Sequence, residues 1–286
     1  MRTGAGRLRR RTVIAAGLGS AALAGGARAQ IGGGKPIRVL VGFSAGGGND
    51  VVARIIAQKL GESTGQTVIV DNKPGASGLI AADILAKAPP DGLTLMVASQ
   101  TTYAVAPVLY RSVAFNAEKD CLGVSLLGAS PLALVVHPSV AAKSVADLIA
   151  MAKAKPGVIN VGHGGVGTTP HMANELFMST AGVKMTPVPY RGEAPAITDL
   201  LSGQLPVMFS NISVCMGHVK SGTLRALGVT SAARSPIAPD LPTIAESGLP
   251  GYEVETWFAL TASPGTPRDV LARLNAEVQK PWSTPT

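Results

Sequence analysis

The sequence predicts an α/β fold arranged in two lobes. Runs rich in β-formers alternate with runs of helical periodicity, the alternation occurs in two successive series, and glycine-rich loops stand where strand passes to helix. Such alternation is typical of parallel sheets with crossover helices. We expect residues 35–126 and 231–286 to form the first lobe and 127–230 the second, with the chain crossing near Gly128 and Thr230.

Each element is expected from a local pattern. The first series predicts strands at 37–43, 67–70 and 94–98, and helices at 50–60 and 78–88. In the second, Ser144 with Asp147 three residues later predicts a helix N-terminus, and Pro267 is expected in the first turn of the last helix. The other expected elements are strands at 132–136, 159–162, 185–190, 205–210 and 224–230, and helices at 144–155, 170–180, 194–201 and 266–278.

Residues 1–29 have the pattern of an export signal. Basic residues precede an apolar run from Val13 to Ala24, and a small-x-small ending at Ala27–Ala29 predicts cleavage after Ala29. The pair Arg10-Arg11 is compatible with the twin-arginine route, while a generic basic segment of an ordinary signal explains it equally. We therefore expect the mature protein in the periplasm.

The remaining composition excludes several classes of function. Six of the 25 basic residues and none of the 17 acidic residues lie in 1–29, so the high isoelectric point predicts no nucleic-acid binding. Cys121 and Cys215 are far apart and are expected as two free buried thiols. No histidine, cysteine or acidic cluster has metal-ligand spacing, so neither a metal nor another cofactor is expected.

The first glycine loop, Gly42 to Asp50, admits two interpretations. Gly42-Phe43-Ser44-Ala45-Gly46 matches the G-x-S-x-G pattern of a nucleophile, which makes a secreted α/β hydrolase using Ser44 the alternative function. The further glycines Gly47 and Gly48 lengthen the loop, and the expected late histidine is absent. We favour an anion cradle of backbone N–H groups at a helix start, with Asp50 as N-cap or first helical residue.

The second glycine loop, Gly162 to Gly167, matches G-x-G-x-x-G between a strand and a helix. A dinucleotide site also needs an acidic residue at the end of the next strand, where this chain has Tyr190-Arg191. Anion binding at the helix start is the simpler interpretation, and His171 is expected to be neutral there because a helix N-terminus disfavours positive charge. A third loop, Asn72 to Gly78, either faces the same cleft or is a plain turn.

With these loops in view, the chain resembles the substrate-binding receptors of tripartite tricarboxylate transporters, also called Bug receptors. The resemblance covers residues 35–280 and rests on ordered motifs: Lys35-Pro36-Ile37-Arg38, Phe43 to Asp50, Val70 to Ala76, Pro90 to Leu95, Val188 to Gly192, and Leu241 to Glu246. It implies a type II periplasmic-binding-protein fold, a Venus-flytrap of two lobes that closes on a ligand. Relatives also continue for about one helix beyond Thr286.

The resemblance further implies a monomeric, non-enzymatic receptor that delivers a small organic acid to membrane transporter subunits. The ligand would be a di- or tricarboxylate, an acidic amino acid or an aromatic acid. The chain departs from the family pattern at Ala45, His163, Glu193, Pro206 and Ser210; Glu193 either recognises an ammonium or hydroxyl group or, as we favour, is an exposed helix-start carboxylate. The implied ligand-binding residues are Ser44, Gly47, Asn49, Asp50, Ser99, Thr101, Gly167, Thr168, Thr169, His171, Tyr190, Gly192 and Asn211.

Overall fold

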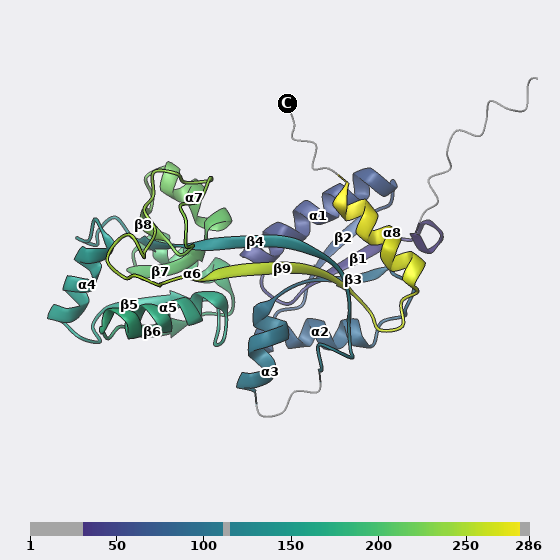
Figure 1. The fold of residues 1–286 in the computed structure, drawn as a ribbon, viewed down its shortest axis with the longest axis horizontal. Coiled ribbons are helices and arrows are strands. Elements are labelled where there is room, and N and C mark those ends of the chain that lie inside the picture. The colour runs from purple at the N-terminus through teal and green to yellow at the C-terminus, as the bar shows by residue number, and fades with distance from the viewer. Residues whose placement is uncertain (1–30, 111–114, 281–286) are drawn as a thin grey trace, which may run out of the picture.

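The computed structural model describes residues 31–110 and 115–280, and the expected signal at 1–29 lies outside them. Two α/β lobes lie next to each other along the long axis of the molecule (Figure 1). They are joined by two long strands, β4 (Leu122–Val136) and β9 (Glu255–Ala262). The expected two-lobed α/β fold is therefore confirmed.

The first lobe is built on strands in the order β2-β1-β3-β9, of which β1 runs parallel to both neighbours. Both faces of this sheet are covered, so β1 is apolar on both sides. Val39 and Val41 pack against α1 and α8, whereas Leu40 packs against α2. The elements are β1 (Ile37–Val41), β2 (Val68–Asn72), β3 (Thr94–Ser99), α1 (Gly48–Thr64), α2 (Leu79–Ala86), α3 (Ala106–Leu109), α8 (Arg268–Gln279), the short 3-10 helices Ile31–Gly34 and Ala76–Gly78, and the π-helix Thr101–Val105.

The second lobe continues the strand order as β4-β7-β5-β6, with β8 paired to the other edge of β4. Leu134 packs with α4 and α5 on one face, and Val135 packs with α6 and α7 on the other. Phe177, Phe209 and Tyr252 form an aromatic cluster in the first of these cores. The elements are α4 (Val145–Ala154), β5 (Asn160–His163), α5 (Thr169–Ala181), β6 (Thr186–Pro189), α6 (Glu193–Ser202), β7 (Val207–Asn211), α7 (Ile212–Lys220) and β8 (Arg225–Val229).

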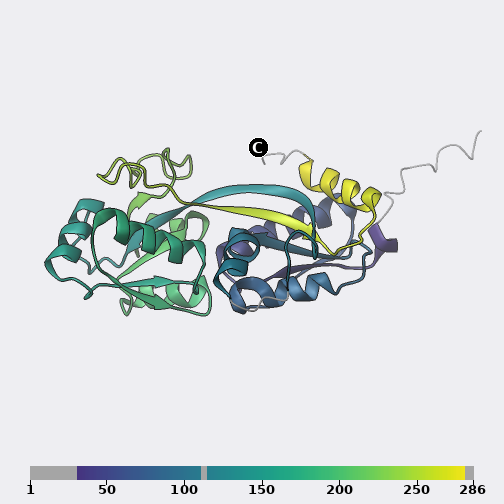
Figure 2. The same ribbon diagram turned by 60° about the horizontal axis from the view of Figure 1, so that its bottom comes forward.

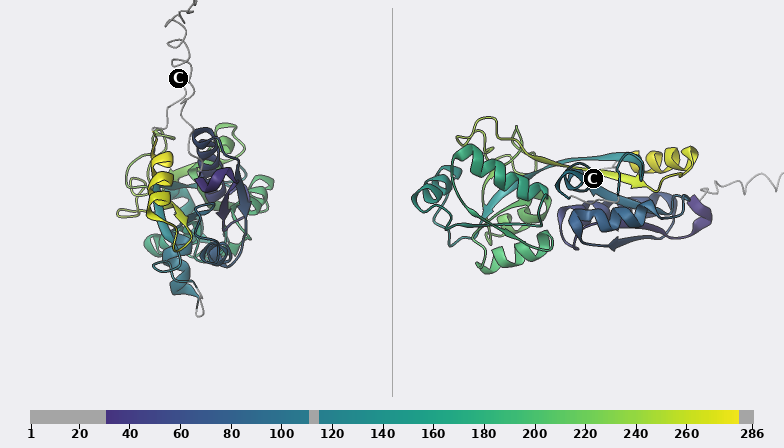
Figure 3. Two further views of the ribbon diagram at one scale, coloured as in Figure 1. Left: turned by 90° about the vertical axis from the view of Figure 1, so that its right-hand side faces the viewer. Right: turned by 90° about the horizontal axis from the view of Figure 1, so that it is seen from below.

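The connection between the lobes is a two-stranded antiparallel ribbon. Residues 122–131 of β4 pair with β9, and from Leu132 onward the same strand pairs with β7. The β4–β9 pairing shifts register between Gly123 and Ser125 and again between Leu126 and Gly128. Figures 2 and 3 show this ribbon running along one side of the molecule, with the lobes facing each other beside it.

Two details of helix starts differ from expectation. Gly47 is the N-cap of α1, so Asp50 is the third helical residue rather than N-cap or first. Pro267 is the N-cap of α8 and precedes its first turn. The cap at Ser144 is confirmed, since its side chain accepts a hydrogen bond from the N–H of Asp147.

The packing bears on where the lobes divide, which remains a proposal. Ile244, Leu249 and Tyr252 belong to the core of the second lobe. Thr230 Oγ1 accepts a hydrogen bond from the N–H of Leu132 and donates one to the carbonyl oxygen of Val254, the residue before β9. We therefore propose that residues 231–254 also belong to the second lobe and that the return crossing is β9. Over the described ranges, no helix has the length and apolar character needed to cross a bilayer.

Candidate functional site

The carboxyl ends of parallel strands in the two lobes face each other. In the first lobe, β1 leads through the first glycine loop into α1, and β3 ends at Ser99. In the second, β5 leads through Gly164–Thr168 into α5, and β7 ends at Asn211, the N-cap of α7. Ligands of open α/β sheets bind at such strand ends. The lobe interface is thus the candidate site.

Two adjoining cavities lie in this interface, and Phe43 and Gly164 line both. The outer cavity, of about 450 Å³, has several exposed residues in its wall; the inner cavity, of about 40 Å³, is lined mostly by buried ones. The outer wall consists of Gly42, Phe43, Pro74, Gly75, Ala76, Ser77, Tyr110, Gly164, Gly165, Val166, Tyr190, Arg191 and Gly192. The inner wall consists of Phe43, Gly47, Gly48, Asn49, Ser99, Thr101, Gly164, Thr168, Thr169, Pro170, Glu193, Asn211 and Thr256.

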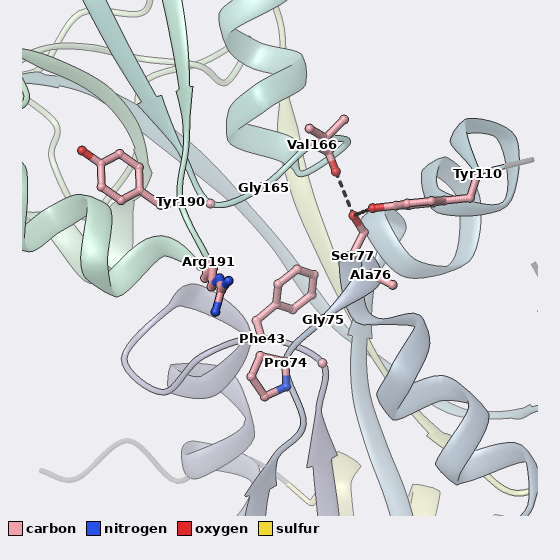
Figure 4. A pocket seen from close by; sticks show the side chains of 13 residues that line it. Phe43, Pro74, Gly75, Ala76, Ser77, Tyr110, Gly165, Val166, Tyr190 and Arg191 are labelled. Carbon is pink, nitrogen blue, oxygen red and sulfur yellow. Dashed lines mark hydrogen bonds between the residues drawn. The ribbon is translucent and has the colours of Figure 1, made fainter.

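Arg191 gives the outer cavity a positive charge. Its side chain points into the space between the lobes, on the side of Phe43 and Pro74 (Figure 4). Among the described residues it has no hydrogen-bond or salt-bridge partner, in contrast to Arg38 and Arg54, which pair with aspartates. A guanidinium group whose N–H donors are free of protein partners can bind a planar carboxylate with two N–H groups.

The rim of the outer cavity is closed by a bond between the lobes. Ser77 Oγ donates to the carbonyl oxygen of Val166 at 2.8 Å and lies 3.1 Å from Tyr110 Oη (Figure 4). The phenol of Tyr190 instead points away and donates to Asp199 at 2.8 Å. Burial and Asp199 raise the pKa of Tyr190 to about 12. Tyr190 therefore contributes backbone and ring edge to this cavity rather than its hydroxyl.

The inner cavity is lined by polar atoms that lack partners. Ser99 Oγ, Thr256 Oγ1, Asn49 Oδ1 and Asn211 Oδ1 are buried without a hydrogen bond to any residue in 31–110 or 115–280. Buried polar atoms in native proteins are nearly always hydrogen-bonded, and each one left without a partner is unfavourable. These four atoms are therefore placed to bind a polar group that enters the cavity.

The carboxylate of Glu193 also borders the inner cavity. Contrary to the expectation of an exposed helix-start residue, Glu193 is only 8% exposed. Its oxygens accept hydrogen bonds from the N–H groups of Gly48 and Asn211, at 3.0 and 2.7 Å. The side chain turns inward because the starts of α1 and α7 supply these donors.

The carboxylate of Asp50 holds the first glycine loop in place without lining either cavity. Its oxygens accept from the N–H of Gly46 at 2.9 Å, from Asn72 Nδ2 at 2.9 Å and from Arg54 Nε at 2.8 Å. Burial alone would raise the pKa of Asp50, but the hydrogen bonds from Arg54, Gly46 and Asn72 lower it below its ordinary value. The hydrogen bonds of the Asp50 carboxylate are thus all made to donors of the first lobe.

Two neighbouring histidines, with their rings tilted by 41°, shape the second glycine loop. The rings of His163 and His171 lie 4.4 Å apart, and His171 Nδ1 accepts from the N–H of Gly167 at 3.2 Å. Burial, with a smaller contribution from His171, lowers the pKa of His163 to about 4, so His163 is neutral near pH 7. Within the described part of the chain, no group of three or more His, Cys, Asp or Glu side chains is placed to hold a metal ion.

Ser44 lacks the surroundings of a nucleophile. Its Oγ is buried and has no hydrogen-bond partner in the part of the chain that the structure describes, whereas an activated serine needs a base within hydrogen-bond reach. His163 and His171 are occupied in the other lobe's loop. The Cα of Gly192 approaches Ser44 so closely that a Cβ there would lie 1.9 Å from Ser44 Oγ. This geometry favours a packing role for Ser44 over the hydrolase alternative.

The structure distributes the sequence-derived site residues over three places. Those lining the inner cavity are Gly47, Asn49, Ser99, Thr101, Thr168, Thr169 and Asn211. Tyr190 and Gly192 line the outer cavity, whereas Ser44, Asp50, Gly167 and His171 line neither and support the loops. Sequence reasoning missed Arg191 and Thr256 as lining residues. The position of Arg191 in the short loop between β6 and α6 was a usable signal for it.

Comparison with known proteins gives a consistent result. Residues 52–286 match the family model described as the tripartite tricarboxylate transporter family receptor. The UPF0065 protein in the tcbD-tcbE intergenic region of Pseudomonas sp. (strain P51) is 40% identical over 252 residues, 88% of this chain and 75% of the relative. Protein BugT of Bordetella pertussis (strain Tohama I) is 37% identical over 247 residues, 86% of this chain and 76% of its own.

Solved structures agree with this assignment. Rpa4515 of R. palustris with adipate has a TM-score of 0.83 at 38% identity, covering 85% of this chain and 82% of that one. MatC from Rhodopseudomonas palustris with bound malate has a TM-score of 0.79 at 33% identity, covering 85% and 83%. The periplasmic binding protein BugD has a TM-score of 0.81 at 32% identity, covering 86% and 82%. The chain therefore belongs to the tripartite tricarboxylate transporter receptor family.

Proposed function

We propose that this protein is a periplasmic receptor that captures a small organic carboxylate between its lobes and delivers it to a tripartite tricarboxylate-type membrane transporter. The observation that carries the proposal is the outer cavity, whose volume of about 450 Å³ suits a small molecule. Its wall includes the guanidinium of Arg191, which no other described residue pairs with. The adipate and malate bound by two structural relatives support the same ligand class. Export by the signal at 1–29 completes this proposal.

Binding would depend on lobe closure. Two hydrogen bonds connect the lobes beside the cavities. One joins Ser77 to Val166, and in the other Gln100 Nε2 donates to Thr169 Oγ1 at 3.2 Å. These bonds form only when the lobes meet, so a ligand that contacts both lobes favours the closed arrangement. Two charge-assisted bonds from Arg191 at about 1.5–3 kcal/mol each, together with backbone N–H groups, supply much of the ~8 kcal/mol that micromolar affinity requires.

Isothermal titration calorimetry tests this function. We expect micromolar binding of at least one acid from a panel of aliphatic mono-, di- and tricarboxylates, acidic amino acids and aromatic acids. Replacing Arg191 with Gln removes the charge and both charge-assisted bonds but keeps an amide N–H donor, so it should weaken that binding at least about tenfold. Arg268→Gln is the matched control, because Arg268 is exposed at the start of α8 and does not line either cavity.

The outcomes separate cleanly. Absence of heat for every acid in the panel would contradict the receptor proposal. Equal binding by the Arg191→Gln and Arg268→Gln variants would show that the carboxylate binds away from the outer cavity. Small-angle scattering with and without the bound acid should show a decrease in the radius of gyration if the lobes close on it.

A further inference from the structure

Three helix N-termini converge on the carboxylate of Glu193. Helix α1 presents the N–H of Gly48 and α7 presents the N–H of its N-cap Asn211, while Glu193 is itself the first residue of α6. The first N–H donates to Oε2 and the second to Oε1. Helix N-termini carry partial positive charge and orient N–H groups toward an anion. The position is therefore built for a carboxylate.

This carboxylate position is fully occupied by the chain itself. In addition to the two N–H groups, Ser210 Oγ donates to Oε1 at 2.8 Å and Asn211 Nδ2 donates to Oε2 at 2.7 Å. A carboxylate accepts about four hydrogen bonds, so these four donors satisfy it. A ligand carboxylate would need the same donors, and Glu193 already holds them.

The remaining wall of the inner cavity offers acceptors and hydroxyls. Because Nδ2 of Asn211 is committed to Glu193, its Oδ1 is left as an acceptor without a partner. The hydroxyls of Ser99 and Thr256, 1% and 3% exposed as residues, are also without partners. The cavity of about 40 Å³ exceeds the ~10–15 Å³ that a buried water molecule requires, so it has room for a small polar group.

We propose that Glu193 acts as a built-in substitute for a ligand carboxylate, and that the inner cavity consequently selects a ligand end carrying a hydrogen-bond donor without negative charge. This inference rests on the proposed receptor function and specifies its ligand. One carboxylate of the solute binds on the Arg191 side, in the outer cavity. The far end bears a hydroxyl or ammonium group, which donates to Asn211 Oδ1 and lies beside the negative charge of Glu193.

The test compares acids that share one carboxylate and differ only at the far end. For the four-carbon chain these are 4-aminobutanoate, 4-hydroxybutanoate and succinate; for six carbons they are 6-aminohexanoate, 6-hydroxyhexanoate and adipate. Calorimetry on the full chain should show the amino or hydroxy acid binding at least about tenfold more tightly than the dicarboxylate of the same length. This comparison requires no variant, so a folding defect cannot obscure it.

Variants then test the role of Glu193 directly. Glu193→Gln removes the charge at nearly constant volume and should reduce the preference for the donor-bearing acid to within about threefold of the dicarboxylate. Glu62→Gln is the matched control, since it removes a carboxylate from the exposed surface of α1 and should retain the wild-type preference. Glu193→Ala leaves the four donors empty, so acetate should raise its melting temperature relative to chloride at equal ionic strength by more than it raises that of wild type, whose only free carboxylate-binding group in the described cavities is Arg191.

The results distinguish the inference from the function on which it rests. A wild-type chain that binds dicarboxylates as tightly as their amino and hydroxy counterparts overturns the inference and leaves the receptor proposal standing. An unchanged preference in Glu193→Gln, or an acetate effect on Glu193→Ala no larger than on wild type, also counts against it. Failure of all six acids and of the wider acid panel to bind would overturn both.

Discussion

Replacing Asp50 with Ala should destabilise the protein although Asp50 lines neither cavity. The side chain of Asp50 is 3% exposed and that of Arg54 is 57% exposed, so Arg54 returns to water at little cost. The donors left behind are the N–H of Gly46 and one N–H of Asn72, each 2.9 Å from a carboxylate oxygen. At ~1–3 kcal/mol for each donor that loses its partner, the free energy of unfolding should fall by about 3 kcal/mol.

Urea unfolding followed by circular dichroism measures this change, with calorimetry of the bound acid alongside it. Asp83→Ala is the matched control, because Asp83 and Lys87 form an i,i+4 pair of the same kind on α2, with both side chains exposed. That variant should lose less than about 1 kcal/mol. Ligand affinity should fall only for Asp50→Ala, since its loop carries Gly47 and Gly48. Equal stability losses in the two variants would contradict a stabilising role for the buried contacts of Asp50.

Three further predictions follow from the structure. The pKa of His163 is about 4 in the folded protein and ordinarily 6.5, so between these values the His163 imidazole is protonated only in the unfolded chain. The free energy of unfolding should therefore decrease by roughly 2 kcal/mol between pH 6.5 and pH 4.5. His163→Gln should remove this part of the pH dependence of urea unfolding. Gly192→Ala should weaken ligand binding at least about tenfold in calorimetry, because its Cβ would lie 1.9 Å from Ser44 Oγ at a φ of 118°; adding Ser44→Gly should restore part of the affinity, and no recovery would assign the loss to backbone strain. Ser144→Ala should cost about 1 kcal/mol in thermal unfolding through loss of its helix cap, whereas a change below 0.3 kcal/mol would mean that the cap contributes little.

Strong local patterns made most of the fold predictable. Strand β1, with Val39, Leu40 and Val41 buried, and the capped helix after Ser144 are determined by nearby residues. The first part of β4 was missed because Gly123, Gly128 and Pro131 interrupt the pattern of a strand. Pairing with β9, more than 120 residues away in sequence, makes these residues a strand.

The loops that form the site were predictable from the sequence, whereas the contacts that individual side chains make there were not. Glycines at strand ends indicated the cradles, and seven of the proposed residues line the inner cavity. The burial of Glu193 depends on the N–H of Gly48, which belongs to the opposite lobe. No local signal reports a donor that distant, so helix-start exposure was the natural and wrong expectation for Glu193.

The ribbon of β4 and β9 has a mechanical consequence. In the described chain, both connections between the lobes, β4 and β9, are hydrogen-bonded to each other along the ribbon. Any separation of the lobes must therefore bend the two strands together. A paired ladder resists bending within its own plane and yields across it, and the irregular register near Gly128, whose φ is 137°, marks a compliant point. The proposed opening of the lobes would thereby be restricted to one axis, which would set the side from which a solute enters.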